Sequence, residues 1–244
     1  WADEGASSFW KRPSLLDGAG GPKDALRQHG ISTDVWYSQY YQGLASGTGP
    51  HDGEYGSKID AFVTLDGGKL GLWKGLFVNI HQEWTFGDNV NNRGGTLLPV
   101  NTALALPEIG GYDHDTSILV TQVFSDQVSL TAGKFNMQDV LAKAPLIGGG
   151  GVDTFMNTGL ALPITGITPP YVLGATLTVK TEPVIYNLFV YDPRNAQSGD
   201  VIENPFSDGT VVLGSVTVPV KPFGLTGFQF FKAASSTQDG LDLA

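Results

Sequence analysis

The chain has 244 residues and a formal net charge of −10, with 24 acidic against 14 basic side chains. This acidic balance argues against nucleic-acid binding, which needs a basic footprint. The absence of cysteine excludes a disulfide framework and any cysteine-based metal site. No apolar run approaches the roughly 18 residues of a membrane-spanning helix. A mean hydropathy of −0.02 suits an amphipathic sheet, whether in a membrane barrel or in a soluble sandwich.

The first predicted element is a short helix between Gly21 and Gly30. Pro22 suits the first helical turn, and Gly30 suits the position just past the end. After Gly30 the sequence reads as strands separated by Gly, Pro, Asn and Asp. We therefore divide the chain into an N-terminal segment, residues 1–30, and an all-β region, residues 31–244.

The clearest strand is predicted over residues 75–87, where side chains alternate in character with a period of two. One face is almost wholly apolar, and the other is mostly polar. The apolar face carries Leu76, Val78, Ile80, Gln82, Trp84 and Phe86, and the polar face carries Phe77, Asn79, His81, Glu83 and Thr85. In a porin wall such a strand turns its apolar face to lipid and places aromatic side chains at the membrane interface.

The same alternation predicts about nine strands in all, many of them near the length needed to cross a bilayer at a tilt. The other predicted strands are 31–42, 57–65, 117–125, 128–132, 173–180, 184–192, 210–218 and 224–233. Tight turns at 66–69, 126–127 and 182–183 contrast with long connections at 87–116 and 136–171. Short turns that alternate with long loops are typical of outer-membrane barrels, although a soluble sandwich can show strands at this spacing.

Several stretches, in their order and spacing, resemble the carbohydrate-selective outer-membrane porins of the OprB type. They are Leu15-Leu16-Asp17-Gly18, Leu26-Arg27-Gln28-His29-Gly30-Ile31, Gly68-Lys69-Leu70-Gly71-Leu72-Trp73-Lys74-Gly75, Asn101-Thr102, Pro107-Glu108, Ala132-Gly133-Lys134-Phe135-Asn136, Phe155-Met156-Asn157 and Val190-Tyr191-Asp192-Pro193. The resemblance implies a sixteen-stranded transmembrane antiparallel β-barrel of the bacterial outer membrane. Such a barrel meets outer-membrane lipid and lets glucose-like sugars diffuse through a water-filled lumen, either as a monomer or as a homo-oligomer.

About nine strands cannot complete the sixteen that the resemblance implies. An open sheet edge in hydrocarbon would leave backbone groups unpaired, at a cost of several kcal/mol each. We therefore expect the chain to be the N-terminal half of a longer barrel protein. If it is complete, it must close by self-association or adopt a fold outside the membrane.

Strand facings predict which residues line the pore. A sugar needs polar groups that match its hydroxyls and flat apolar surfaces for its ring faces. The predicted lining residues are Asp34, Trp36, Tyr40, Gln42, Asn79, His81 and Glu83, joined by Arg93 and Glu108 from the loop at 87–116. Arg93 is the expected basic residue of the constriction, with Glu83 or Glu108 as its acidic counterpart, or else it lies on a solvated loop tip. Trp36 is expected to stack on a sugar, to belong to an aromatic girdle or to fill a gap near the N-terminal helix.

No catalytic constellation or metal-ligand spacing stands out. His81 and Glu83 share a strand face, but no ligand spacing of the zinc type surrounds them, so we interpret His81 as a polar residue of the lumen. We expect a passive pore without catalytic residues, metal or cofactor. Two alternatives remain: a soluble all-β carbohydrate-binding module, and a glycoside hydrolase, which would need two carboxylates at a fixed separation.

Overall fold

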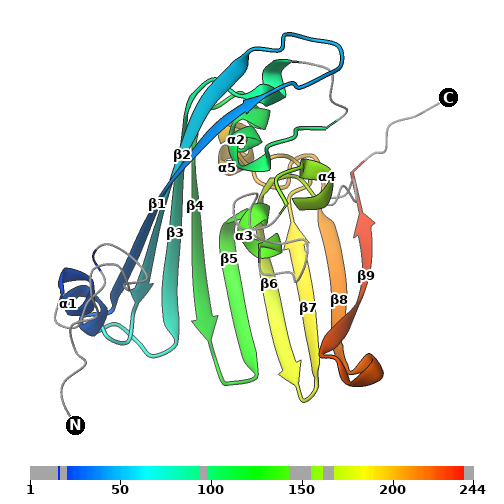
Figure 1. The fold of residues 1–244 in the computed structure, drawn as a ribbon. Helices are drawn as coiled ribbons and strands as arrows, with labels where there is room; N and C mark the ends of the chain where they lie inside the picture. Colours follow the sequence, from blue (N-terminus) through cyan, green and yellow to red (C-terminus); the bar gives the residue numbers. More distant parts are fainter. Residues whose placement is uncertain (1–15, 17–20, 94–97, 143–154, 162–167, 239–244) are drawn as a thin grey trace.

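The computed structural model describes residue 16 and residues 21–93, 98–142, 155–161 and 168–238. They form one antiparallel sheet of nine strands, in which each strand pairs with the next along the chain (Figure 1). The strands are β1 (Ile31–Gly43), β2 (Gly53–Asp66), β3 (Leu76–Gly87), β4 (His114–Val123), β5 (Val128–Asn136), β6 (Tyr171–Thr181), β7 (Val184–Tyr191), β8 (Val211–Val220) and β9 (Gly227–Ser236). The predicted all-β class and the predicted number of strands are confirmed.

The connections differ in length at the two ends of the sheet. At one end the strands are joined by turns over 67–75, 124–127, 182–183 and 221–226, and at the other end by loops over 44–52, 88–113, 137–170 and 192–210. The loops carry short helices: α2 (Thr102–Ala105), α3 (Met137–Leu141), α4 (Thr158–Ala161) and α5 (Gly199–Glu203). Sequence analysis predicted the long loops at 88–113 and 137–170. It did not predict the loop at 192–210 or these helices, which are only one turn long.

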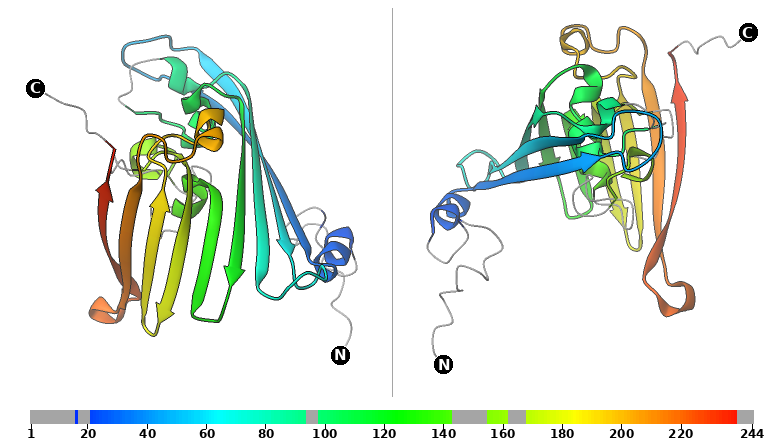
Figure 2. Two further views of the ribbon diagram at one scale, coloured as in Figure 1. Left: turned by 180° about the vertical axis from the view of Figure 1, so that it is seen from behind. Right: turned by 45° about the horizontal axis from the view of Figure 1, so that its top comes forward.

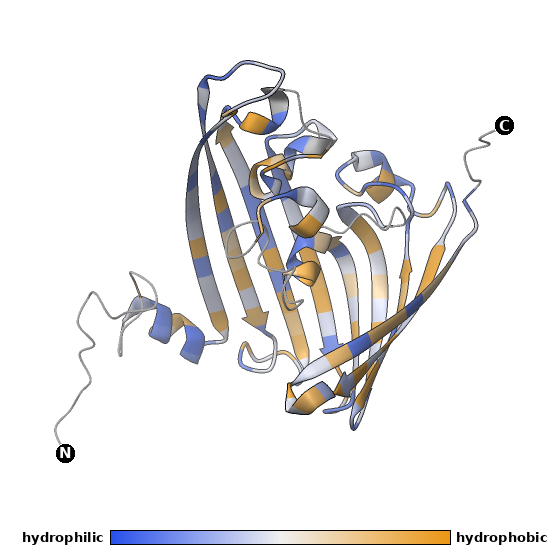
Figure 3. Cartoon of the chain, turned by 45° about the vertical axis from the view of Figure 1, so that its right-hand side comes forward, coloured by the Kyte–Doolittle hydropathy of each residue, from blue (hydrophilic) through white to orange (hydrophobic). Residues whose placement is uncertain are grey.

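The sheet curves, and α2, α3 and α4 lie on its concave side (Figures 1 and 2). Hydrophobic and hydrophilic residues are interspersed along the strands (Figure 3). A row that crosses eight strands on the convex face is apolar throughout: Ile31, Leu65, Val78, Val120, Ala132, Ala175, Val190 and Val212. Large apolar side chains of this face are exposed, among them Val35, Tyr37, Trp84, Phe86, Ile118, Leu130, Leu177 and Leu188. The predicted alternation is therefore present, with the apolar side turned outward.

The N-terminal helix α1 (Pro22–Gln28) packs against β1 at the short-turn end. Pro22 lies in its first turn as predicted, and Gly30 follows it with a φ of +86°. Lys23 Nζ lies 2.6 Å from the Asp34 carboxylate, which joins the helix to the strand. Among the described residues, no helix has both the length and the apolar character to cross a membrane. The division of the chain at residue 30 stays a prediction.

The ladder between β4 and β5 is shorter than its neighbours. It covers only Leu119–Val123 and Ser129–Gly133, although both strands continue beyond it. Gly133 has a φ of +139°, and a Cβ there would lie 2.1 Å from the Ile118 carbonyl oxygen. Only glycine adopts this conformation without strain at so close an approach. The two strands consequently part at Gly133, and side chains connect them beyond that point.

Candidate pore wall

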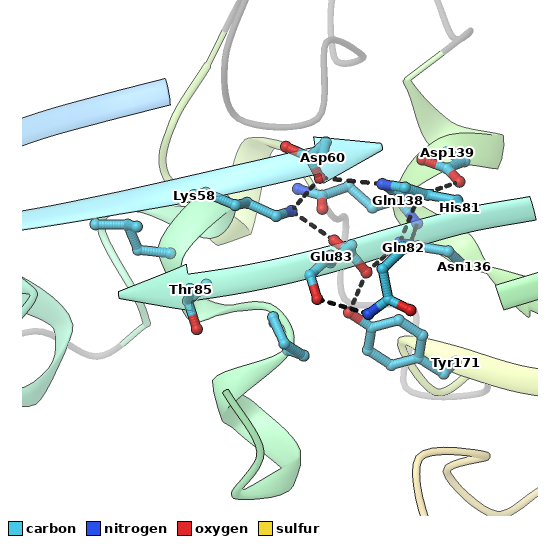
Figure 4. Close-up of polar contacts among 12 residues, drawn as sticks. Lys58, Asp60, His81, Gln82, Glu83, Thr85, Asn136, Gln138, Asp139 and Tyr171 are labelled. Carbon is cyan, nitrogen blue, oxygen red and sulfur yellow. Dashed lines mark hydrogen bonds and ion pairs between the residues drawn. The ribbon is translucent and has the colours of Figure 1, made fainter. Parts of the chain in front are cut away.

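A buried polar cluster lies on the concave face, where β2 and β3 pass beneath α3 (Figure 4). Its members come from both strands, from α3 and from the residues on either side of the loop at 137–170. We call it the inner-wall cluster, and it consists of Lys58, Asp60, His81, Glu83, Asn136, Asp139 and Tyr171. The members on β2 and β3 share one face of the sheet because Asp60 is paired with Glu83 in the register, and His81 lies two residues from Glu83.

Glu83 is the centre of this cluster, and its side chain is only 1% exposed. Oε1 accepts from Lys58 Nζ at 2.5 Å. Oε2 accepts from Asn136 Nδ2 and from the Tyr171 hydroxyl, each at 2.8 Å. A carboxylate removed from water is tolerated when an opposite charge and hydrogen-bond donors surround it. Both Glu83 oxygens are occupied by protein donors.

His81 bridges the strand wall and the loop helix. Its Nε2 lies 3.0 Å from Asp60 Oδ1, and its Nδ1 lies 2.8 Å from Asp139 Oδ2. Both ring nitrogens can donate only in the imidazolium form, so this form matches the two carboxylates. The Phe62 ring stacks on the imidazole with 4.0 Å between centroids. The imidazole is thereby fixed in orientation from three sides.

Asp60, His81 and Glu83 offer three potential metal-ligand atoms within 4.8 Å of one another. Lys58 already supplies a cation between the two carboxylates, at 3.1 Å from Asp60 and 2.5 Å from Glu83. The ammonium satisfies the same oxygens that a metal would need. The geometry fits an internal ion-pair network, and the interpretation of His81 as a polar residue of the lumen stays a prediction.

The gap beyond Gly133 is closed by a second ion pair. Lys134 Nζ lies 2.5 Å from Asp115 Oδ1, and Asp115 is paired in register with Glu83. The same ammonium lies 5.5 Å from the centre of the Tyr171 ring, within cation–π distance. Buried charges of both signs therefore continue from β2 across β3 and β4 to β5.

The other predicted lining residues of the strands lie at different heights on the concave face. Trp36 is paired with Asp60 and is 53% exposed. Asn79 accepts from the Thr64 hydroxyl at 2.9 Å, and Asp34 bonds to Lys23 of α1. Tyr40 is half-buried on β1.

Two predicted residues belong to the loop at 88–113. Glu108, in the 3-10 turn η3 (Glu108–Gly110), accepts from the Asn89 side chain at 2.6 Å. Arg93 ends the 3-10 turn η2 (Val90–Arg93), and its side chain lies outside the described part of the structure. The structure does not bring Glu108 into the inner-wall cluster. The pore-lining role of each predicted residue stays a prediction.

The long loops contact one another as well as the wall. Thr102 Oγ1 donates to the Met156 carbonyl at 2.6 Å, and the Gln197 amide donates to the Pro107 carbonyl at 2.8 Å. Leu106, Tyr171, Ala196 and Val201 form a buried apolar cluster in which loops 88–113 and 192–210 meet β6. Asn101 Nδ2 reaches Gln42 Oε1 of β1 at 2.6 Å. The described residues of these three loops therefore contact one another as well as the strands.

Sequence analysis placed Glu83 and His81 on one polar strand face but did not identify their partners. Lys58 and Asp60 stand on the polar face of the strand predicted at 57–65, so that alternation was an available signal. Asn136 and Tyr171 flank the loop at 137–170, with 34 residues between them along the chain. Their convergence on one carboxylate depends on how β5 and β6 are placed, which no local pattern encodes.

Comparison with known proteins agrees with the fold. No protein-family model matches the sequence, and no curated protein matches it significantly. The structure is similar to that of OprB from Pseudomonas putida, solved at high pH, with a TM-score of 0.69 and 18% sequence identity. The match covers 90% of this chain and 55% of that chain, so this chain spans little more than half the length of its structural counterpart. The predicted similarity to the OprB-type porin fold is confirmed.

Proposed function

We propose that the chain forms part of the wall of an outer-membrane porin through which small sugars diffuse passively. The observation that carries this proposal is the two-sided sheet. Its convex face presents an unbroken apolar row and exposed large apolar side chains, whereas its concave face holds hydroxyl, amide and charged groups of both signs. A water-soluble module would bury such an apolar face, whereas a bilayer solvates it.

The sugar preference is supported by the chemistry of the concave face. Trp36 is 53% exposed on that face, in the same cross-strand row as Asp60 and Glu83. A flat aromatic surface beside charged and amide groups suits the two faces of a sugar ring. Charges of both signs on one wall also avoid strong selection for ions of one sign. Asp34, Tyr40, Asn79, Arg93 and Glu108 complete the proposed lining, and no catalytic step, metal or cofactor is assigned.

The test is electrical and uses the protein expressed from its complete reading frame. The native protein should require detergent for extraction and should migrate differently on a gel before and after boiling. In a planar bilayer it should conduct ions, and glucose or maltose should block that current reversibly. A protein that stays in the aqueous fraction and shows no channel would overturn the proposal. Hydrolysis of oligosaccharides that a single carboxylate mutation abolishes would favour the hydrolase instead.

A further inference from the structure

We propose that Glu83 is a positioning residue that sets the width of the pore, because it anchors both ends of the loop at 137–170 to the wall. This inference rests on the porin function proposed above. Tyr171 stands immediately after the loop and Asn136 immediately before it, and both donate to the same Glu83 oxygen at 2.8 Å. The Met137 amide donates to the Pro170 carbonyl at 2.8 Å, which holds the two ends together.

A second contact fixes the direction in which the loop leaves the wall. Asn136 caps α3 through its side chain, which accepts from the Gln138 amide at 2.9 Å. One turn further along, Asp139 bonds back to His81 on β3. The helix is thus tied to the wall at its start and along its length, on the concave side of the sheet (Figures 1 and 4). Asp139 is the exposed end of this connection, with 39% of its side chain accessible, whereas Glu83 and His81 are buried.

The anchor extends to the neighbouring loops. Thr102 of α2 donates to the carbonyl of Met156, in the loop at 137–170, through both its backbone amide and its hydroxyl. The Ala196 amide of the loop at 192–210 donates to the Tyr171 carbonyl at 2.9 Å. Since Tyr171 also holds Glu83, one buried carboxylate connects the strand wall to three loops. The helices α2, α3 and α4 lie on the concave side (Figures 1 and 2), so release of the described residues that carry them is expected to widen the passage.

The hydrogen bonds around Glu83 fix the position of its carboxylate and of the residues that donate to it. Its carboxylate contacts three protein donors, and its side chain is 1% exposed, so a passing sugar has no free oxygen to bind. Buried polar groups that are fully hydrogen-bonded favour one arrangement over alternatives. The cluster therefore acts on sugars through the loop that it positions, and the contacts with sugar belong to exposed side chains such as Trp36.

The experiment removes two connections while leaving the Lys58–Glu83 pair intact. In Asp139→Ala/Tyr171→Phe the loop keeps its apolar packing but loses one bond to His81 and one bond to Glu83. Single-channel conductance and the influx of a trisaccharide into liposomes should each rise by at least about twofold, because flux depends on the narrowest cross-section. The matched control is Val140→Ala/Tyr186→Phe, which alters an exposed residue of α3 and an exposed tyrosine of the convex face. It should behave as wild type.

Two further measurements separate repositioning of the loop from general damage. Asp139→Asn keeps an oxygen that accepts from His81, so it should retain wild-type conductance. The chain has no cysteine, so a spin label on Val140→Cys reports motion of α3 directly, and its spectrum should sharpen in the double variant. If the double variant loses its heat-dependent gel shift, Tyr171→Phe alone carries the test, because it removes only the hydroxyl that donates to Glu83.

The outcomes distinguish this inference from the porin function itself. A wild-type protein that conducts and passes sugars, together with a double variant of unchanged conductance and unchanged label mobility, overturns the role of Glu83 and leaves the porin in place. A wild-type protein without channel activity overturns both. A conductance increase that also appears in the control variant counts against the anchor.

Discussion

Lys58 and Glu83 form an ion pair on neighbouring strands in which both side chains are almost completely buried, at 3% and 1% exposure. The register of β2 and β3 places them diagonally on one face, so the pair depends on correct alignment of the two strands. Removal of one partner leaves an uncompensated buried charge, whereas replacement of both partners by isosteric neutral groups does not.

We expect Lys58→Met to lower the free energy of unfolding by roughly 3–5 kcal/mol, the range for breaking a buried pair. The double variant Lys58→Met/Glu83→Gln should recover a large part of that loss, because no buried charge stays unpaired. Urea unfolding in detergent micelles, followed by tryptophan fluorescence, measures both values. Equal destabilisation in the single and double variants would contradict the pairing.

Neighbouring residues of β7 test whether the convex face meets lipid. Leu188 is exposed on the convex face, and Asn187 accepts from Thr178 on the concave face. Leu188→Arg should destabilise the inserted barrel by about 2–4 kcal/mol if it lies near the bilayer midplane, and Asn187→Arg should cost much less. The measurement is the folded fraction in lipid vesicles, taken from the gel shift. A larger loss of stability in Asn187→Arg than in Leu188→Arg would rule out contact of the convex face with lipid.

Gly133 and Gly214 provide a matched pair of glycine substitutions. A Cβ at Gly133 would lie 2.1 Å from the Ile118 carbonyl, in a backbone conformation with φ of +139°, whereas a Cβ at Gly214 meets no atom within 4 Å. Gly133→Ala should therefore cost at least about 1–3 kcal/mol in strain, and Gly214→Ala should be tolerated. Thermal unfolding of the gel-shifted form compares them. Tolerance of Gly133→Ala would show that β4 and β5 do not part at that residue.

Asn101 is expected to hold the loop at 88–113 in place. Its side chain caps α2 by accepting from the Leu104 amide at 3.1 Å, and it also donates to Gln42. Asn101→Ala should destabilise this loop by about 1 kcal/mol through loss of the cap alone. Hydrogen exchange of residues 101–106 should accelerate, while Asn187→Ala on β7 should leave these amides unchanged. Unaltered exchange in Asn101→Ala would exclude Asn101 as the anchor of this loop.

The loop at 192–210 should lose stability in acid. Burial alone would raise the pKa of Asp192, but hydrogen bonds from Arg194 and from the Phe206 amide hold that pKa below its usual range. A lowered pKa means that ionised Asp192 stabilises the fold above about pH 4, and that this stabilisation is lost as the pH falls through the folded-state pKa. Asp192→Asn should therefore unfold at a lower temperature than wild type at pH 6.

The difference between Asp192→Asn and wild type should shrink as the pH falls toward 2. Asp208→Asn is the matched control, because Asp208 is exposed and lies 3.8 Å from Arg194. A temperature difference that stays constant across this pH range would count against ionisation of Asp192 as the cause.

The strands were predictable because their pattern repeats every two residues, with apolar side chains on one face and polar side chains on the other. Positions 76–87 show this best, where Trp84 and Phe86 lie on the exposed face and His81 and Glu83 on the buried one. The partners of Glu83 were not predictable. Lys58 needs the register of β2 with β3, and Tyr171 needs a return from a long loop, so both depend on non-local geometry. The turn-length helices in the loops carry too few residues to show a helical period.

The interlocked loops bear on how a protein of this fold is re-engineered. Thr102 is tied to Met156, and Gln197 to Pro107, so each loop supplies part of the surface against which another folds. Replacing a single loop by its counterpart from another protein of this fold would leave the neighbouring loops without their partners. Loop exchange between such proteins therefore requires transfer of the three segments together, along with the residues beneath them on β2 and β3.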